Sequence, residues 1–403
     1  MSATPLKNLR VLDFSKVLAG PLCTQYLGDM GADVIKVETR DQGDDSRHWP
    51  AFRSVEGGDQ FGTPFLAANR NKRSIALDLK TEAGQSICHE LGKWADVVIE
   101  SFGPGVATRL NVDGKTLSEI NPRLVYCSIS GFGSTGPMRD RKGYDVILQA
   151  FTGMLSITGE PGGPSVRSPF SPVDQATGLH ALIGILAGLQ QRHSTGVGCT
   201  VEASLFDTSA AFLAYFLQGF WERGTEPQKP GSGHESLCPY ETFDASDRPL
   251  ILGVANDSLW RSFCAIAGLQ EYVDDPRFRT NADRVKNRSE TVAMVRVAVK
   301  QRPRDQWIEE LEAAGIPCSP LHTLGELSDH PHTSQSGMVF TYQHPVLGET
   351  KGVSQPLKFD GHRAELRNAP PSLGEHTREI LEEIGYSPER IDLLMRDGVT
   401  RPQ

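Results

Sequence analysis

The first third of the chain alternates short apolar runs with longer segments of helical periodicity. The apolar runs cover residues 9–14, 33–38, 96–100 and 124–129, and each has the length and composition of a buried strand. Helical patterns occupy residues 20–31 and 81–94, and a further helix is expected near residue 116. Because short apolar strands separated by helices form parallel sheets with both faces covered, this region is predicted to be a parallel α/β domain.

The pattern changes beyond residue 130. Long helices are expected at residues 172–191 and 204–220, with a strand at 199–203 between them, and residues 224–233 have the glycine, proline and charge of a linker. Beyond the linker we expect strands at 249–254 and 339–342, polar helical segments between 281 and 314, and helices at 258–268, 375–384 and 388–395. The chain is therefore predicted to be an α/β protein, with a Rossmann-like parallel sheet in a large domain plus a smaller α/β domain.

Composition and charge narrow the function classes. The 403 residues carry a net charge of −9, which argues against nucleic acid as a partner but leaves room for local basic clusters. No uninterrupted apolar stretch is long enough to span a bilayer, and residues 1–7 lack an apolar signal core. These features predict a cytoplasmic protein with no membrane partner.

The seven cysteines are scattered and contain no CxxC pair, so zinc sites and disulfide frameworks are not expected. Most of these cysteines are predicted to be small buried hydrophobic residues. The sequence His330-Pro331-His332 resembles a metal-binding fragment, but the proline and the lack of a nearby cysteine favour a surface turn.

Asp174 is the candidate for chemistry. It follows Pro172 and precedes the apolar run 181–189, so it lies near the start of a buried helix. The partial positive charge at a helix N-terminus favours an ionised carboxylate, and carboxylates serve as covalent nucleophiles toward activated acyl groups. The alternative from the local pattern is that Asp174 only caps its helix.

Cations gather in loops near the predicted strand ends: Lys36, Arg40, Arg70, Lys72, Arg73, Lys80, Arg109, Arg139, Arg141 and Lys142. Ligands of open α/β sheets bind beyond the carboxyl ends of the strands, where such cations suit a phosphate-bearing molecule. The alternative, ordinary ion pairs, is expected for about half of them. Residues 131–136 match the GxGxxG dinucleotide pattern, but Pro137 and the charges after it argue against the helix that this motif requires.

Several blocks, taken in order, resemble the class III CoA-transferases, the formyl-CoA transferase and carnitine CoA-transferase family. They are LDF (12–14), AGP (19–21), GADVIKVE (31–38), GDDSR (43–47), NRNKRSIALDLK (69–80), FGPG (102–105) with Arg109, SGFG (130–133), GYD (143–145), the Asp174 segment and GEHT (374–377). Each block is a weak signal alone, but together they cover nearly the whole chain.

The resemblance implies that Asp174 is the nucleophile and that coenzyme A thioesters are substrates, with no metal and no prosthetic group. It implies CoA contacts at Leu18, Ala19, Arg40, Leu77, Asp78, Leu79, Lys80, Ser101, Phe102, Gly103, Arg109, Arg141, Lys142, Gly143 and Tyr144. It also implies a homodimer of interlocked rings. Its large domain would combine residues 1–224 with a C-terminal return at 336–403, and residues 225–335 would form the small domain.

The acid substrates are less well specified by the resemblance. The formyl-CoA branch has a glycine-rich loop over the active site. The corresponding loop of this chain, residues 253–257, contains a single glycine. Together with Pro239 and Tyr240 upstream, this version looks more like branches that transfer CoA from succinyl-CoA to a free dicarboxylic acid such as glutarate.

Two other functions stay open. The α-methylacyl-CoA racemases of the same family need a histidine where this chain has Tyr144, whose ordinary pKa makes it a poor base. A non-catalytic CoA-binding protein would be expected to lack Asp174.

The sequence leaves the roles of five further residues open. His180 could reach the site, although a packed histidine is the more common case. Asp145 could contact CoA, orient the site or make a structural hydrogen bond, and Glu38 could pair with a neighbouring cation. Trp49 and Phe52 could line an acyl pocket, but packing in a core or interface is the more common role of aromatic residues.

Overall fold

The computed structural model describes residues 4–54 and 60–401. Its centre is a six-stranded sheet with the order β5-β2-β1-β6-β7-β8, in which every neighbouring pair is parallel. The strands are β1 (Arg10–Asp13), β2 (Asp33–Thr39), β5 (Arg73–Leu77), β6 (Val97–Glu100), β7 (Val125–Ser130) and β8 (Cys199–Ser204). The prediction of a parallel α/β sheet is confirmed.

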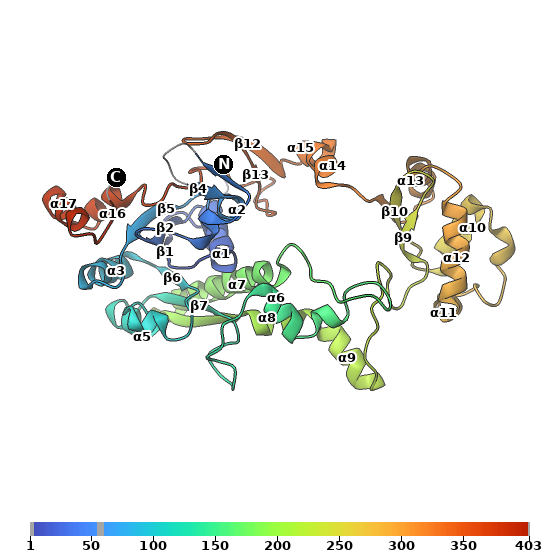
Figure 1. The fold of residues 1–403 in the computed structure, drawn as a ribbon, viewed down its shortest axis with the longest axis horizontal. Coiled ribbons are helices and arrows are strands. Elements are labelled where there is room, and N and C mark those ends of the chain that lie inside the picture. The colour runs from blue at the N-terminus through green and yellow to red at the C-terminus, as the bar shows by residue number, and fades with distance from the viewer. Residues whose placement is uncertain (1–3, 55–59, 402–403) are drawn as a thin grey trace. The chain divides into compact units, whose positions relative to one another are not determined.

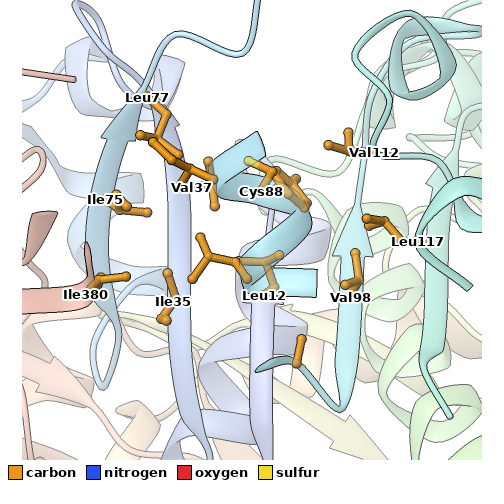
Figure 2. Close-up of a cluster of buried hydrophobic side chains, with 14 of the residues drawn as sticks. Leu12, Ile35, Val37, Ile75, Leu77, Cys88, Val98, Val112, Leu117 and Ile380 are labelled. Carbon is orange, nitrogen blue, oxygen red and sulfur yellow. The ribbon is translucent and has the colours of Figure 1, made fainter. Parts of the chain in front are cut away.

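Helices cover both faces of this sheet, as the alternation of strands and helices predicts. On one face lie α3 (Glu82–Trp94) and α5 (Gly114–Ile120), and on the other lie α1 (Ala19–Asp29) and α7 (Pro172–Thr195) (Figure 1). The first face carries a core in which Leu12, Ile35 and Ile75 of adjacent strands pack with Cys88 of α3 (Figure 2).

The C-terminal residues return to this sheet. Ile380 of α16 (Thr377–Glu383) belongs to the same core as Ile35 and Ile75 (Figure 2), and α17 (Pro388–Arg396) adds Ile391 and Leu394. The backbone beyond α17 also contacts the end of β5, since the Asp78 amide donates to the Val399 carbonyl at 2.8 Å.

Shorter elements complete this unit. They are β3 (Phe52–Ser54), β4 (Gln60–Gly62), α2 (Thr63–Ala68), α4 (Val106–Arg109), α6 (Asp145–Phe151), α8 (Leu205–Phe212), α15 (Pro331–Gln335), β12 (Val339–His344) and β13 (Gly348–Val353). The strand predicted at 339–342 is present as β12, which pairs antiparallel with β13. His330-Pro331-His332 is a junction between two helices rather than a simple turn, since α15 begins at Pro331.

The chain divides into two compact units. Unit 1 holds residues 1–152, 168–217 and 331–403, and unit 2 holds residues 153–167 and 218–330. The expected small domain, 225–335, did not include residues 153–167.

Unit 2 is built on a three-stranded antiparallel sheet, β11-β10-β9. Its elements are β9 (Tyr240–Asp244), β10 (Pro249–Gly253), β11 (Cys318–Pro320), α10 (Asp257–Ala267), α11 (Asn281–Lys286), α12 (Arg288–Val299), α13 (Arg304–Ala313) and α14 (Leu324–Asp329). Its core contains a run of stacked rings formed by Trp260, Phe263 and Trp307.

The single helix predicted at 204–220 is wrong. The structure has two helices there, α8 and α9 (Ala214–Arg223), with a break at Leu213. The Leu213 amide donates to the carbonyl of Ala210, three residues back, at 3.0 Å. This tighter closure ends the α-helical hydrogen-bond ladder.

Candidate active site

A cavity of about 540 Å³ opens at the carboxyl edge of the parallel sheet. It is lined by residues at or just after the ends of β1, β6, β7 and β8, among them Lys16, Ser101, Ser130 and Glu202. In the strand order, β2 lies on one side of β1 and β6 on the other, so the chain reverses direction across the sheet between β1 and β6. Open α/β sheets bind their ligands at such a switch point.

Asp174 lines this cavity from the first turn of α7. The side chain is half-buried, and its carboxylate accepts no hydrogen bond from residues 4–54 or 60–401. Asp145 caps the helix instead: its Oδ2 accepts the backbone N–H of Val173 at 2.8 Å and that of Asp174 at 3.1 Å. The capping alternative for Asp174 is therefore not what the structure shows.

Two close backbone approaches fix the walls of the cavity. A Cβ on Gly178, one turn beyond Asp174, would clash with the Ala19 carbonyl oxygen, so glycine there lets α7 pack against the start of α1. A Cβ on Gly131 would lie 2.6 Å from the Gly143 nitrogen, so glycine there brings two lining loops together. The GxGxxG match thus serves loop packing. No helix begins within it, and the next one starts at Asp145.

Burial in the cavity raises the pKa of Asp174 to about 7, and the nearby negative charge of Asp145 adds to this shift. The expectation that the helix N-terminus would favour an ionised Asp174 is corrected here. The N–H donors of that terminus are occupied by Asp145, so they do not stabilise the Asp174 anion. Near neutral pH Asp174 is a partly ionised carboxyl group with no hydrogen-bond partner in the described ranges.

Seven of the ten clustered cations separate into two sets, and Arg40, Lys80 and Arg109 belong to neither. Lys36, Arg70, Lys72 and Arg73 are buried and paired with Asp44, Asp29, Asp13 and Asp33, respectively. Arg139, Arg141 and Lys142 line the cavity. The ion-pair alternative therefore holds for the first set. Of the cations singled out in the sequence, only the second set lines the cavity, and within it Arg139 also pairs with Asp140 at 3.6 Å. Glu38 is also paired, with Arg47 at 2.7 Å, as predicted.

The residues that the resemblance assigned to CoA fall in different places. Those in the cavity lining are Leu18, Ala19, Ser101, Phe102, Gly103, Arg141, Lys142, Gly143 and Tyr144. Those outside it are Arg40, Leu77, Asp78, Leu79, Lys80 and Arg109. Arg109 ends α4, whose earlier residues line the cavity. Arg40 pairs with Asp41 and also donates to the Gly398 carbonyl, and Leu77 is a core residue.

Sequence reasoning missed several lining residues, notably Lys16, Val17, Glu100 and Glu202. The signal that could have found them is position: Lys16 and Val17 follow β1, Glu100 ends β6, and Glu202 lies near the end of β8. Val17 has φ of 70°, a left-handed conformation that β-branched residues rarely adopt. Its amide donates to both carboxylate oxygens of Asp44 at 3.2 Å, which holds the chain in this conformation.

His180 and Trp49 lie outside the cavity lining. The Nδ1 atom of His180 is 2.9 Å from the Thr208 hydroxyl, Trp49 is exposed, and the Phe52 side chain lies outside the described residues. Most cysteines are buried, as predicted. Within the described ranges, no group of three or more His, Cys, Asp or Glu side chains could hold a metal ion, and no helix has the length and apolarity needed to cross a membrane.

Comparison with known proteins identifies the family. The chain matches the family model described as CoA-transferase family III over residues 6–377. It is 36% identical over 400 residues to succinyl-CoA:glutarate CoA-transferase of Mus musculus, covering 99% of this chain and 91% of that protein. It is 35% identical over 382 residues to succinate–glutarate CoA-transferase of Agrobacterium fabrum, covering 94% and 96%.

A solved structure agrees with these sequence matches. A CaiB/BaiF family protein from Brucella suis superposes with a TM-score of 0.85 and 36% identity, over 95% of this chain and 100% of that one. The family predicted from the ordered sequence blocks is confirmed, and the chain belongs to CoA-transferase family III.

Proposed function

We propose that this enzyme moves CoA from succinyl-CoA or a similar donor to a free dicarboxylic acid such as glutarate, with Asp174 as the nucleophile. The observation that carries the proposal is the carboxyl group of Asp174, which lies in a cavity at the carboxyl edge of the sheet and has no hydrogen-bond partner among the described residues. The choice of acids is supported by relatives at 35–36% identity that are named for succinate or succinyl-CoA and glutarate.

The chemistry needs one ionised carboxylate that is used twice. An oxygen of Asp174 attacks the thioester carbon of succinyl-CoA, the C–S bond breaks, and CoA leaves as a thiolate. The thiolate attacks the aspartyl carbon of the mixed anhydride, which releases succinate and leaves an aspartyl-CoA thioester. The acceptor carboxylate then displaces the thiolate from the aspartyl carbon. The thiolate finally attacks the acceptor acyl carbon, which forms the new CoA ester and regenerates Asp174.

The cavity offers recognition as well as a nucleophile. Arg141 and Lys142 in its lining are suited to the phosphates of CoA, since each carries a permanent or near-permanent positive charge close to the site. Lys16, which follows β1, adds a cation on another wall.

A homodimer is part of the proposal. Large apolar side chains of unit 1 are exposed on α6, α7 and α8, among them Phe151, Ile183 and Phe212. Neighbouring exposed apolar residues of this kind mark association surfaces. Light scattering of the purified protein should give twice the chain mass, and a monomer would contradict this part of the proposal.

The acids are tested directly by product analysis. The enzyme is incubated with succinyl-CoA and a panel of free acids, including glutarate and oxalate, and new thioesters are identified by mass spectrometry. We expect glutaryl-CoA and free succinate in equal amounts. Transfer to oxalate alone would overturn the dicarboxylate assignment. Exchange of the α-proton of an acyl-CoA without CoA transfer would indicate a racemase, and binding of CoA without either reaction would indicate a non-catalytic protein.

A further inference from the structure

A buried chain of hydrogen bonds ends at Asp174. The Ser168 amide donates to Oε1 of Gln149 at 3.0 Å, and Nε2 of Gln149 donates to Oδ1 of Asp145. The other oxygen of Asp145 accepts the amides of Val173 and Asp174. Gln149 is 1% exposed and Asp145 is 7% exposed. Both ends of the Gln149 amide and both oxygens of Asp145 are thus engaged, so the chain has one defined arrangement.

The position of Asp174 in its helix makes this chain necessary. An acidic side chain in the first turn normally reaches back to the unpaired amides at the helix N-terminus. Ser171, which precedes the helix, makes no side-chain cap and has φ of 52°. Without Asp145, the free amides of the first turn would therefore attract the Asp174 carboxylate itself. An Asp174 anion held by those amides would be less nucleophilic and would be turned toward its own helix.

Gln149 and Asp145 have separate tasks. Asp145 occupies the amides, and it reaches them from α6, a helix that lies 28–29 residues earlier in the chain. Gln149, one helical turn beyond Asp145, donates to Oδ1 of Asp145 and so fixes the rotamer of the Asp145 side chain. The Ser168 amide in turn fixes the orientation of the Gln149 amide.

We propose that Gln149 and Asp145 are positioning residues that keep the Asp174 carboxylate free of its own helix and available to the acyl group. This inference rests on the proposed role of Asp174. It assigns work to two residues that do not themselves bond to the acyl group.

Other titratable groups face the same region and must be considered in any pH test. Two of them come from elements packed against α7, namely Glu202 of β8 and Asp207 of α8. The others line the cavity: Lys16, Asp45, Glu100, Arg139, Asp140, Arg141, Lys142 and Tyr144. Glu202 already accepts from the Ser134 hydroxyl, and Asp207 from the Ser204 hydroxyl. Among the charged groups, Asp145 is the one that raises the pKa of Asp174.

The test compares two glutamines of equal burial. Gln149→Met removes both amide hydrogen bonds while keeping the shape of the side chain. Gln25→Met is the matched control. Gln25 is 2% exposed, donates to the Ala67 carbonyl at 3.0 Å and accepts the Arg70 amide at 3.1 Å, away from the cavity lining. The two variants should lose similar thermal stability, because each loses one donor and one acceptor contact.

Of the two methionine variants, only Gln149→Met should lower the rate of CoA transfer. We expect kcat to fall at least tenfold, with KM for the acyl-CoA within about twofold of wild type. Gln25→Met should leave both constants of the folded enzyme unchanged. Asp145→Asn should have a larger effect on kcat and should move the acid limb of kcat/KM to lower pH by at least one unit, since the repelling charge is gone. Equal kcat for the two methionine variants, or an unmoved acid limb in Asp145→Asn, would overturn the inference.

A second readout separates this inference from the proposed function. Carboxyl-labelled aspartate allows Asp174 to be titrated by ¹³C NMR in the free protein, whether or not it turns over any acid. The Asp174 midpoint should fall in Asp145→Asn and, by less, in Gln149→Met, and should stay unchanged in Gln25→Met. Absence of transfer in the wild type would sink the proposed function alone, whereas identical midpoints in all four proteins would sink the positioning role alone.

Discussion

Asp13 and Asp174 lie in the same unit, at the carboxyl edge of the same sheet, and have opposite surroundings. Asp13 is fully buried and accepts the Ser15 amide at 2.9 Å and the Thr24 hydroxyl at 2.6 Å, with the Lys72 ammonium at 3.2 Å. Burial alone would raise the pKa of Asp13, but Lys72, Lys36 and these hydrogen bonds hold it below its ordinary value. Asp174 has none of these partners, and its pKa is raised to about 7.

The number of hydrogen-bond donors and cations around each carboxylate determines whether it has a structural or a reactive role. A carboxylate surrounded by donors is held in one charge state and one position, so it organises the chain around it. Here the Asp13 network, through Lys36 and its bond to the Ser15 carbonyl, shapes the loop that enters the cavity at Lys16. A carboxylate with no donor keeps its lone pairs for another molecule. The same residue type thus supports the fold in one place and offers reactivity in the other.

The largest effect should come from Asp174→Asn. The amide has nearly the shape of the carboxylate but cannot attack a thioester, so we expect CoA transfer to fall by about a thousandfold or more. Binding of CoA, measured by calorimetry, should be retained. A variant that keeps a tenth of the wild-type rate would contradict the assignment of Asp174, provided that deamidation is excluded by mass spectrometry.

The corresponding test of the Asp13 network is Lys72→Met. It leaves Asp13 buried without its closest cation, and breaking such a pair costs about 3–5 kcal/mol. The free energy of unfolding, measured in urea, should fall by this amount. Arg10→Met is the control, because the Arg10–Asp96 pair is partly exposed, Arg192 still pairs with Asp96 after the change, and the lost pair should contribute less than about 1 kcal/mol. Equal losses in the two variants would contradict a structural role for the Asp13 network.

The comparison also predicts opposite effects on stability. In the unfolded chain Asp174 titrates near 3.8, and in the folded protein near 7, so the folded state holds this proton more tightly. Ionisation of Asp174 therefore lowers the free energy of unfolding. This loss is absent below about pH 4, grows between about pH 4 and 7, and is complete above about pH 7. Asp174→Asn should raise the free energy of unfolding by about 2 kcal/mol at pH 8, less than the full linkage value because the group is partly solvated.

Urea unfolding of wild type and Asp174→Asn at pH 4, 6 and 8 checks this expectation. The advantage of the variant should shrink as the pH falls and vanish near pH 4. A constant difference across this range would mean that Asp174 titrates normally in the folded protein.

The smallest effects should come from the cations of the cavity. Lys142→Gln and Arg141→Gln each remove one charge from the lining, and each should raise KM for the acyl-CoA by about three- to tenfold, with kcat little changed. The increase should shrink at high salt, because the interaction is electrostatic. Arg40→Gln and Lys80→Gln, outside the lining, should raise KM by less. A larger effect from this second pair would place the CoA phosphates beyond the cavity.

Much of the fold could be predicted from the sequence, because the spacing of apolar residues and the alternation of strands with helical segments determine it. The apolar strands that became β1, β2, β6 and β7 are short, bounded by polar residues and separated by helical segments. The break at Leu213 could not be predicted, since residues 204–220 contain neither glycine before 219 nor proline. The antiparallel partner strands β9 and β11 of unit 2 also lacked a clear apolar run.

The site was predicted less completely, and for a physical reason. Asp174 was found from its place before an apolar helix, but its ionisation depends on burial in the cavity and on the charge of Asp145. Asp145 is distant in sequence and carries no local signal of capping another helix. The cations of residues 69–74 and those of 139–142 look alike in the sequence. Only the tertiary structure shows that acidic partners surround the first group and that the second group borders a cavity.

The most direct test of the nucleophile is to trap the activated carboxyl group of Asp174. The enzyme is mixed with succinyl-CoA and quenched with hydroxylamine, which converts an aspartyl anhydride or thioester to a hydroxamate, and the peptides are sequenced by mass spectrometry. The account predicts a hydroxamate at Asp174 that disappears in Asp174→Asn and requires the acyl-CoA. An enzyme that forms new CoA esters while Asp174 stays unmodified in every such trap would contradict it.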